Sequence, residues 1–384
     1  MQSEKSKLQR KNSVWTFLAK YISSDAAGVN EFLHTKHWTL AIPNWILRAV
    51  GQPVFVNNPY SGLLILIALF FGDPWVALCG TICLLAAIAT AFAVKQEYSL
   101  IESGVCTFHG LLIGLLLGVS VDREWYPLLI LPLIILGSAS VYVANGVGNI
   151  YKVWNLPALT LPFCLLTFIF LGAFDSTSAT HYPLKAAPDA VSNTTTLDWG
   201  KVFLSIPISV GQVYAYDGLL TGCFISAAIC LASPILALHA LIGGFISAFT
   251  AIGLSAPPLE IYSGLWGYSA VLTSEAVGGF FFRLTPHSHI LAWLGGVLTT
   301  LVHATLSRCF SQLGLPVLTL PFVLTTSILL AFTSKSPQFS RIPMGKLSSP
   351  ERHLLLKRDV QTGEIDQASE MVEGKSPEKR SETE

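Results

Sequence analysis

The sequence predicts an all-α polytopic membrane protein made of two homologous halves. The chain of 384 residues is 52% hydrophobic and only 12% charged, and its apolar residues gather in long runs. Such runs predict membrane spans, in which helices satisfy their own backbone polar groups. The third observation is that motifs of the first half recur in the second. Because the formal net charge is 0, no nucleic-acid partner is expected.

Five apolar runs are the clearest expected spans or part-spans. They cover residues 74–94, 126–143, 161–172, 224–245 and 315–332. A helix needs about 20 apolar residues to cross a bilayer, so shorter pieces such as 62–71 are expected to be half-helices.

Both ends of the chain are expected to lie in the cytoplasm. Residues 1–42 begin with a basic stretch that no apolar core of signal-peptide type follows, which indicates a retained tail. Residues 334–384 are rich in Lys, Arg, Glu and Ser, which is typical of a solvated tail. Their basic residues directly follow the last apolar run, and the positive-inside rule places them in the cytoplasm.

Residues 174–200 are expected to form an extracellular linker loop between the halves. This stretch is polar and poor in basic residues, and it contains the sequon Asn193-Thr194-Thr195. Asn193 is therefore a candidate glycosylation site.

The two halves, residues 43–173 and 201–333, share motifs at a nearly constant distance. Gly51-Gln52 recurs 160 residues later as Gly211-Gln212, and LPALTLPF, which begins at Leu156, recurs 159 residues later as LPVLTLPF. Two homologous halves are common in transporters and channels. An odd number of crossings in each half would make the halves antiparallel.

The repeated LPxxTxPF segment predicts irregular backbone at membrane depth. Pro157 and Pro162 have no N–H, so carbonyls such as that of Ala158 would lack helical partners. Such backbone is tolerated where protein covers it or where it lines a polar cavity. Thr160 and Thr319 would then face one another and offer donors and acceptors without charge. The alternative is a pair of kinked helices whose threonines bond to their own turns.

LPxxTxPF, present twice, resembles the signature of the urea transporters. VFVNNPYSG from Val54, GQVYAYD from Gly211 and LSAPPLEIYSGLWGY from Leu254 also resemble this family, over residues 43–345. The resemblance implies a plasma-membrane homotrimer with a passive urea pore in each protomer. It also implies two inverted halves with about ten transmembrane helices plus re-entrant or discontinuous helices in the lipid bilayer.

The resemblance further implies the residues of the pore. By their positions in these motifs they are Gln52, Phe55, Phe108, Leu112, Thr160, Gln212, Tyr268, Leu272 and Thr319. The glutamines would lie near the two mouths, the aromatics and leucines would form flat slots, and the threonines would form the narrowest point. Taken singly, each glutamine could be an ordinary packing amide and each aromatic a core residue.

These residue types suit urea, which is neutral and planar. Hydroxyls and carbonyls replace the hydrogen bonds that urea loses on dehydration, and the absence of fixed charge excludes ions. No cofactor or metal is expected, and the chain has no motif of a membrane enzyme. Its seven cysteines fall in apolar segments and are interpreted as packing residues.

Two positions depart from the family. His109 and Ser269 stand where the vertebrate members usually have asparagine, so both are candidate selectivity variants. His109 is either a neutral imidazole bonded to backbone or part of a proton or ammonia path. A channel that also passes ammonia or water therefore stays open as an alternative.

An ion-coupled secondary transporter is the other alternative. It would use acidic residues in or beside the apolar runs, and the candidates are Glu102, Asp217, Glu260 and Glu275. None recurs in the other half, so most are interpreted as interface or cap residues, and Glu102 is the one to examine at a pore mouth.

Overall fold

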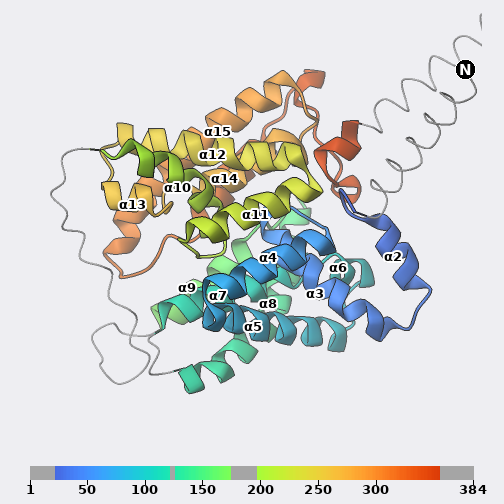
Figure 1. The fold of residues 1–384 in the computed structure, drawn as a ribbon. Helices are drawn as coiled ribbons and strands as arrows, with labels where there is room; N and C mark the ends of the chain where they lie inside the picture. Colours follow the sequence, from blue (N-terminus) through green and yellow to red (C-terminus); the bar gives the residue numbers. More distant parts are fainter. Residues whose placement is uncertain (1–21, 122–125, 174–196, 355–384) are drawn as a thin grey trace, which may run out of the picture.

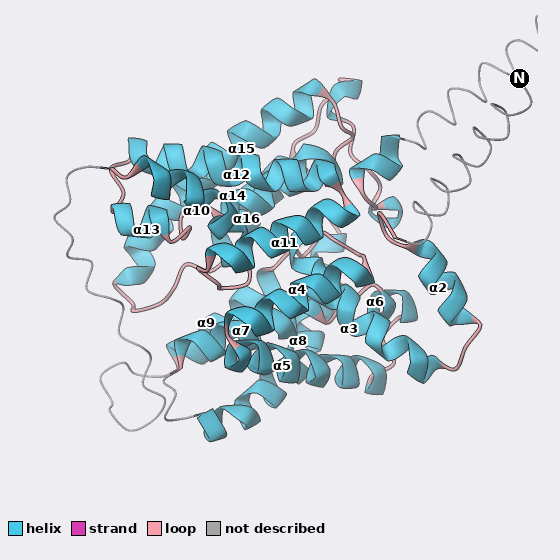
Figure 2. Ribbon diagram, in the orientation of Figure 1, coloured by secondary structure: helices cyan, strands magenta, loops and turns pink. Residues whose placement is uncertain are grey.

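The computed structural model describes residues 22–121, 126–173 and 197–354. Within these ranges the chain is helical and forms no strand, apart from an isolated β-bridge between Phe282 and Arg341 (Figure 2). Asn193 and most of the expected linker lie outside the described residues, as do half of the expected N-terminal tail and most of the expected C-terminal tail.

The helices of the first half follow a short N-terminal helix, α2 (Ala27–His34), and a 3-10 turn, Trp38–Ala41. They are α3 (Ile42–Gly51), α4 (Pro59–Gly72), α5 (Pro74–Ala93), α6 (Tyr98–Glu102), α7 (Phe108–Ser120), α8 (Tyr126–Lys152) and α9 (Leu161–Gly172). A 3-10 turn, Gln52–Val54, joins α3 to the segment before α4.

The second half repeats this order. Its helices are α10 (Trp199–Gln212), α11 (Leu219–Ala232), α12 (Pro234–Gly253), α13 (Pro258–Tyr262), α14 (Tyr268–Glu275), α15 (Pro286–Ser311) and α16 (Leu320–Ala331). A π-helical turn, Ala276–Phe280, continues α14. In Figure 1 the blue-to-green first half lies below the yellow-to-orange second half, and α4 packs against α11 between them.

Polar caps followed by proline explain where the helices start. Asn58 accepts the N–H of Tyr60 at 2.9 Å before α4, and Asp73 accepts the N–H of Trp75 at 3.0 Å before α5. Ser233 accepts the N–H of Leu236 at 3.1 Å before α12. Each cap satisfies a backbone donor that the first helical turn leaves unpaired.

The apolar run over residues 224–245, interpreted as a span or part-span, is divided between two helices. The chain breaks at Ser233, whose φ is −152°, so that α11 ends at Ala232 and α12 begins at Pro234. The apolar pattern continues through this break because both helices pack in apolar surroundings. Proline at the first helical position fits a helix start and not a helix interior.

Among the described residues, four helices are long and apolar enough to cross a membrane. They are α5, α12, α15 and the Pro127–Lys152 part of α8. A fifth crossing is possible if the pair Trp38–Val54 and Pro59–Gly72, bent by 78°, acts as one span. The remaining apolar helices α7, α9, α11 and α16 are shorter. At 12 residues, α9 is about 18 Å long, well short of the hydrocarbon core.

The bent pair depends on a close backbone approach. A Cβ at Gly62 would lie 1.8 Å from the carbonyl oxygen of Leu47, so α3 and α4 can only pack this closely with glycine. Gly222 does the same for α10 and α11, where a Cβ would lie 2.2 Å from the oxygen of Pro207. Small residues of this kind are typical of helix contacts in membranes.

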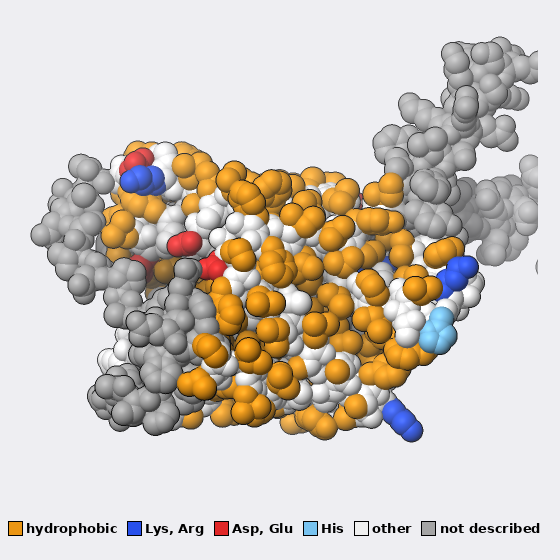
Figure 3. Space-filling view, turned by 60° about the horizontal axis from the view of Figure 1, so that its bottom comes forward, with side chains coloured by type: hydrophobic (Ala, Val, Ile, Leu, Met, Phe, Trp, Pro, Cys, Tyr) orange, Lys and Arg blue, Asp and Glu red, His pale blue; other side chains and the backbone are white. Residues whose placement is uncertain are grey.

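The exterior is that of a membrane protein. Large apolar side chains are widely exposed, such as Leu131 at 64% and Ile328 at 66%. Figure 3 shows apolar side chains over most of one face, with few charged ones, mainly toward its left and right edges. Because soluble monomers rarely expose continuous apolar surface on this scale, the chain is a helical membrane protein.

Candidate functional site

The two LPxxTxPF segments meet inside the molecule. Thr160 and Thr319 are the residues before α9 and α16, and their Oγ1 atoms lie 2.6 Å apart in a hydrogen bond. Each threonine is only 3% exposed. Neither bonds its hydroxyl to its own helical turn, so the kinked-helix interpretation does not describe this geometry.

The backbone before each threonine is irregular, as the prolines predict. Leu159 and Leu318 adopt φ values of +50° and +55°, a left-handed conformation that is uncommon for a branched side chain. The Ala158 carbonyl has no α-helical partner at Pro162, but the N–H of Leu161 donates to it at 3.1 Å in a tighter turn. The Leu159 carbonyl accepts no hydrogen bond from the described residues.

The two glutamines are held in the same way. Nε2 of Gln52 donates to the carbonyl of Ser103 at 2.5 Å, and Nε2 of Gln212 donates to the carbonyl of Ser263 at 2.8 Å. The bond at Nε2 holds each amide in place. No other described residue donates a hydrogen bond to its Oε1. Each glutamine therefore presents a free acceptor, which a packing amide would not.

Phe108 and Tyr268 are the first residues of α7 and α14, and each is 8% exposed. Leu112 and Leu272 follow one turn later and are buried. The hydroxyl of Tyr268 donates to the carbonyl of Leu318 at 2.7 Å.

Phe55 belongs to an aromatic cluster that sequence patterns did not indicate. Its ring centre lies 4.8 Å from that of Phe280, 5.8 Å from that of Phe281 and 6.2 Å from that of Phe322. The π-helical turn places Phe280 and Phe281 here, where Gly279 takes a φ of +145°. The only signal in the sequence is the run GGFFF.

One cavity of about 840 Å³ connects several of these residues. From the first half it is lined by Gln52, Phe55, Phe108, His109, Ala158 and Leu159. Neither Thr160 nor Thr319 lines it, and Gln212, Tyr268 and Leu272 also lie outside its lining. The cavity therefore ends before the threonine pair and exposes one side of the site.

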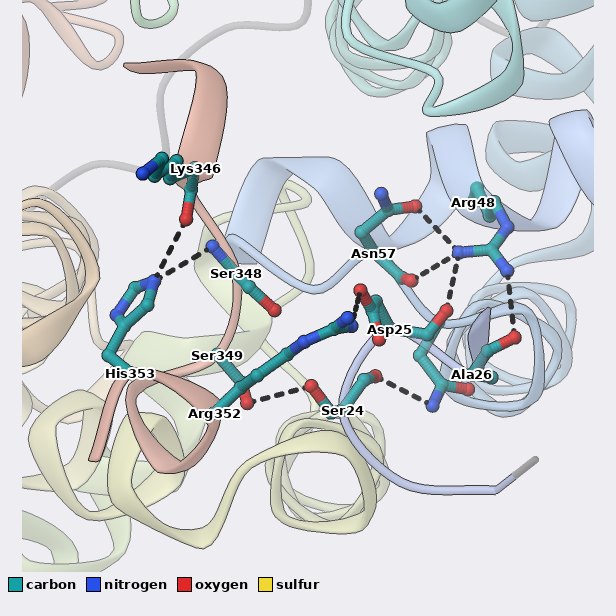
Figure 4. A network of polar contacts seen from close by, with 11 residues as sticks. Ser24, Asp25, Ala26, Arg48, Asn57, Lys346, Ser348, Ser349, Arg352 and His353 are labelled. Atoms are coloured by element: carbon teal, nitrogen blue, oxygen red, sulfur yellow. Dashed lines mark hydrogen bonds and ion pairs between the residues drawn. The ribbon is translucent and has the colours of Figure 1, made fainter. Parts of the chain in front are cut away.

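Both terminal segments also line this cavity, through Ser24, Asp25 and residues 347–349. Arg352 forms an ion pair with Asp25, and the hydroxyls of Ser24 and Ser349 lie 2.8 Å apart (Figure 4). We call these four residues, with Arg48 and Asn57, the terminal network.

Arg48 is the buried centre of the terminal network. Its guanidinium donates to the carbonyls of Asp25 at 2.9 Å and Asn57 at 2.5 Å, and its side chain is fully buried. Glu351 extends the network to α12, where it accepts the Ser233 hydroxyl at 2.7 Å and the Ile235 N–H at 3.0 Å. Sequence patterns did not indicate this network, because its members are far apart in the chain.

His109 and Ser269, the two residues that differ from those usual in the family, are both buried. Nδ1 of His109 and the hydroxyl of Ser269 have no hydrogen-bond partner among the described residues. Nδ1 of His109 therefore does not form the backbone hydrogen bond that was expected of a neutral imidazole. The His109 ring packs against that of Phe108, with 3.9 Å between ring centres.

The four acidic candidates do not form a site together. Glu102 pairs with His34 at 3.2 Å and does not line the cavity, and Glu260 accepts the indole N–H of Trp266 at 2.9 Å. Asp217 is exposed. Glu275 is fully buried without a partner among the described residues, so it is neither a surface cap nor an exposed interface residue.

The seven cysteines, interpreted as packing residues, are not all buried. Cys79, Cys83, Cys106 and Cys164 are buried, whereas Cys223, Cys230 and Cys309 are exposed. Cys164 also has a polar contact, because its Sγ lies 3.4 Å from Oγ1 of Thr319.

An apolar exterior around a cluster of neutral polar groups at the threonine pair defines a helical integral membrane protein suited to a neutral polar solute. Known proteins agree with this class: a sequence profile of the urea transporter family matches residues 43–334. The chain is 33% identical to Urea transporter 1 of Ovis aries over 356 residues, which cover 89% of this chain and 91% of that protein. It is 32% identical to Urea transporter 1 of Rattus norvegicus over 339 residues, with 87% and 88% covered.

The chain belongs to the urea transporter family. This confirms the resemblance drawn from the repeated motif. Members of this family are transporters and not enzymes.

Proposed function

We propose that this protein is a passive urea channel of the plasma membrane, which lets urea move down its concentration gradient. The observation that carries the proposal is the contact between Thr160 and Thr319, which joins the two copies of the motif by neutral hydroxyls. Family membership and the Urea transporter 1 relatives support urea as the solute.

Urea would enter through the cavity and exchange its water for protein acceptors. The free Oε1 of Gln52 accepts a urea N–H near the mouth, and the ring of Phe108 packs against the flat face of the molecule. The unpaired carbonyl of Leu159 then accepts a second N–H. Each exchange replaces a hydrogen bond to water with one to a fixed group, which keeps the cost of dehydration low.

Passage requires the two threonine hydroxyls to separate. A urea molecule between them takes over their mutual bond, because its oxygen accepts one hydroxyl and its N–H donates to the other. Tyr268, Leu272 and Gln212 would receive it on the far side. Asp25, Glu97 and Lys152 line the outer cavity, but the groups proposed to contact urea from Gln52 to Gln212 carry no charge. At these groups an ion would gain nothing in return for its lost hydration.

We further propose the architecture that goes with this function. The repeated helix order supports two inverted halves, with the shorter helices α7, α9, α11 and α16 as re-entrant or discontinuous pieces and about ten crossings in all. Both termini would lie in the cytoplasm, the cavity would be the cytoplasmic mouth, and Asn193 would be glycosylated outside. Three protomers, each with its own pore, would assemble in the bilayer.

The proposal is tested with purified protein in liposomes. An inward urea gradient is imposed without a sodium or pH gradient, and liposome volume is followed by stopped-flow light scattering. Rapid, at most weakly saturating urea entry is expected. Urea entry only with an imposed ion gradient would favour the coupled transporter, and no entry at all would overturn the proposal.

A further inference from the structure

Aromatic rings from both halves meet in the lining of the cavity. Phe55 comes from the first half and Phe280 from the second; both line the cavity, and their ring centres lie 4.8 Å apart. Neither ring lies within a long helix. Phe55 follows a 3-10 turn and has a φ of +58°, and Phe280 ends a π-helical turn in which Gly279 has a φ of +145°. The segments packed against these two turns therefore influence how close the rings lie.

The N-terminal segment holds the loop that follows Phe55. Nδ2 of Asn58 donates to the carbonyl of Ser24 at 2.9 Å. The guanidinium of Arg48 joins the same two parts of the chain, because it donates both to this loop and to the carbonyl of Asp25. Asn58 is close to Phe55 in the chain, so docking of the N-terminal segment restrains the position of the Phe55 ring.

The C-terminal segment holds the turn that carries Phe280. The N–H of Ile342 donates to the carbonyl of Phe281 at 2.8 Å. Pro350 packs on Gly279 so closely that a Cβ at this glycine would lie 3.1 Å from the Cβ of Pro350. Docking of the C-terminal segment therefore restrains the position of the second ring.

The two terminal segments are joined to each other by an ion pair and a hydroxyl contact. Arg352 pairs with Asp25, and the hydroxyls of Ser24 and Ser349 lie 2.8 Å apart (Figure 4). The N–H of Ser24 also donates to the carbonyl of Ala232 at 3.0 Å, so this joint lies against the second half. The side chains of the ion pair are 29% and 45% exposed, and such pairs contribute little to global stability. The pair can therefore act on the rings without deciding whether the protein folds.

We propose that Asp25 and Arg352 are positioning residues whose ion pair closes the terminal segments into a clasp that holds Phe55 against Phe280. The clasp thereby limits the width of the solutes that enter the cavity. This inference rests on the proposed urea channel and deepens it. With the clasp closed, the rings admit flat, narrow urea. When the ion pair is lost, the rings are free to separate, and bulkier analogues of urea enter.

The first test removes the ion pair and measures which solutes pass. Entry of dimethylurea relative to urea is measured in liposomes at equal protein amounts. The ratio is expected to rise about two- to fivefold in Arg352→Ala, the change in open population that follows from loss of one partly exposed ion pair. Arg352→Lys keeps the charge and should keep the wild-type ratio. Arg308→Ala is the matched control, because Arg308 is an exposed arginine of α15 that forms no ion pair with a described residue.

A reversible crosslink tests the clasp itself. The side chains of Ser24 and Ser349 are close enough to form a disulfide when both are replaced by cysteine. Ser24→Cys/Ser349→Cys is combined with Arg352→Ala. The oxidised protein is expected to return to the wild-type ratio, and the reduced protein is expected to show a ratio at least as high as that of Arg352→Ala. Wild-type protein taken through the same oxidation and reduction controls for the native cysteines, and peptide mapping verifies the bond.

Several outcomes would overturn the proposal. They are a wild-type ratio in Arg352→Ala, an equal rise in Arg308→Ala, a verified disulfide that leaves the raised ratio unchanged, and failure of the two introduced cysteines to crosslink. If Arg352→Ala does not fold, the cysteine pair is compared oxidised and reduced with Arg352 retained, and only a higher ratio in the reduced form supports the clasp. If the wild-type protein carries no urea at all, the channel function itself fails, and this result is distinct from unchanged ratios in an active protein.

Discussion

At the scale of single residues, the site is made of neutral groups whose hydrogen-bond partners lie far away in the chain. Thr160 and Thr319 bond each other, and Gln52 and Gln212 each bond a backbone carbonyl of their own half. Groups held in this way need little rearrangement when a solute replaces one of their bonds, which is the requirement for fast and selective passage.

Replacing Thr160 with valine tests the constriction. Thr160→Val keeps the side-chain shape but removes the hydroxyl that bonds Thr319, so urea entry is expected to fall by at least about tenfold, equivalent to ~1.4 kcal/mol. Initial rates in liposomes at equal protein amounts measure this. Thr167→Val is the matched control, because Thr167 is a buried threonine of α9 outside the pair. An equal loss in both variants would count against a specific role for Thr160.

His109 is expected to affect which solutes pass. His109→Asn restores the residue usual in the family and replaces an imidazole that packs on Phe108 with a smaller amide. The relative entry of urea, methylurea and ammonia is expected to change, because the slot beside Phe108 widens. Entry of each solute is measured separately against the wild type, and an unchanged order of solutes would assign His109 a structural role only.

At the scale of elements, helix ends decide where the site lies. The breaks at Asp73 and Ser233 divide apolar sequence into separate helices, and α9 and α16 begin at the threonine pair. Helix starts are polar and locally irregular, so they place hydroxyls and free carbonyls at depths where continuous helices would present only side chains.

Ser233 is expected to stabilise the start of α12. It caps the helix and also donates to Glu351 of the C-terminal segment. Ser233→Ala is expected to cost about 1 kcal/mol from the lost cap and more from the lost anchor, and therefore to lower the thermal unfolding temperature. Ser226→Ala is the control, because the Ser226 hydroxyl bonds only a carbonyl of its own helix, at 2.8 Å. Equal shifts in the two variants would contradict this anchoring role.

The C-terminal segment is expected to loosen in acid. Burial lowers the pKa of His353, whose Nε2 accepts the Ser348 N–H at 3.1 Å. Undocked His353 titrates near its usual value of about 6.5, so the docked state binds fewer protons and becomes less stable as pH falls below that value. Hydrogen exchange of residues 344–354, corrected for intrinsic rate, should rise between pH 7.5 and 5.5. His353→Gln should abolish this pH dependence, and its persistence would assign the effect to another group.

At the scale of the whole molecule, the two halves are similar in helix order and different in chemistry. The second half contacts the first through Tyr214, whose hydroxyl donates to the Val50 carbonyl at 2.8 Å, and through Tyr216, which donates to the Asp73 carbonyl at 3.2 Å. The terminal network occurs at one end only, where it borders the cavity. The site is therefore asymmetric although the motifs are duplicated.

Tyr214 is expected to stabilise the contact between the halves. Its hydroxyl bond is fully buried, and Tyr214→Phe leaves the Val50 carbonyl unpaired, at a cost of roughly 1–3 kcal/mol. The midpoint of thermal unfolding in detergent is expected to fall. Tyr216→Phe should cause a smaller shift, because its bond is longer and less buried. A larger effect for Tyr216 would show that hydroxyl burial does not control this contact.

The sequence by itself determined the membrane class, the repeated helix order and the family, because these depend on apolar runs and on motifs that are local in the chain. It also indicated Thr160 and Thr319 through their duplicated motif. Only the tertiary structure decided which groups are paired, including the Tyr268 bond to Leu318, the Phe280 contact with Phe55 and the terminal network. These contacts join residues far apart in the chain, and no local periodicity encodes the partner of a buried polar group.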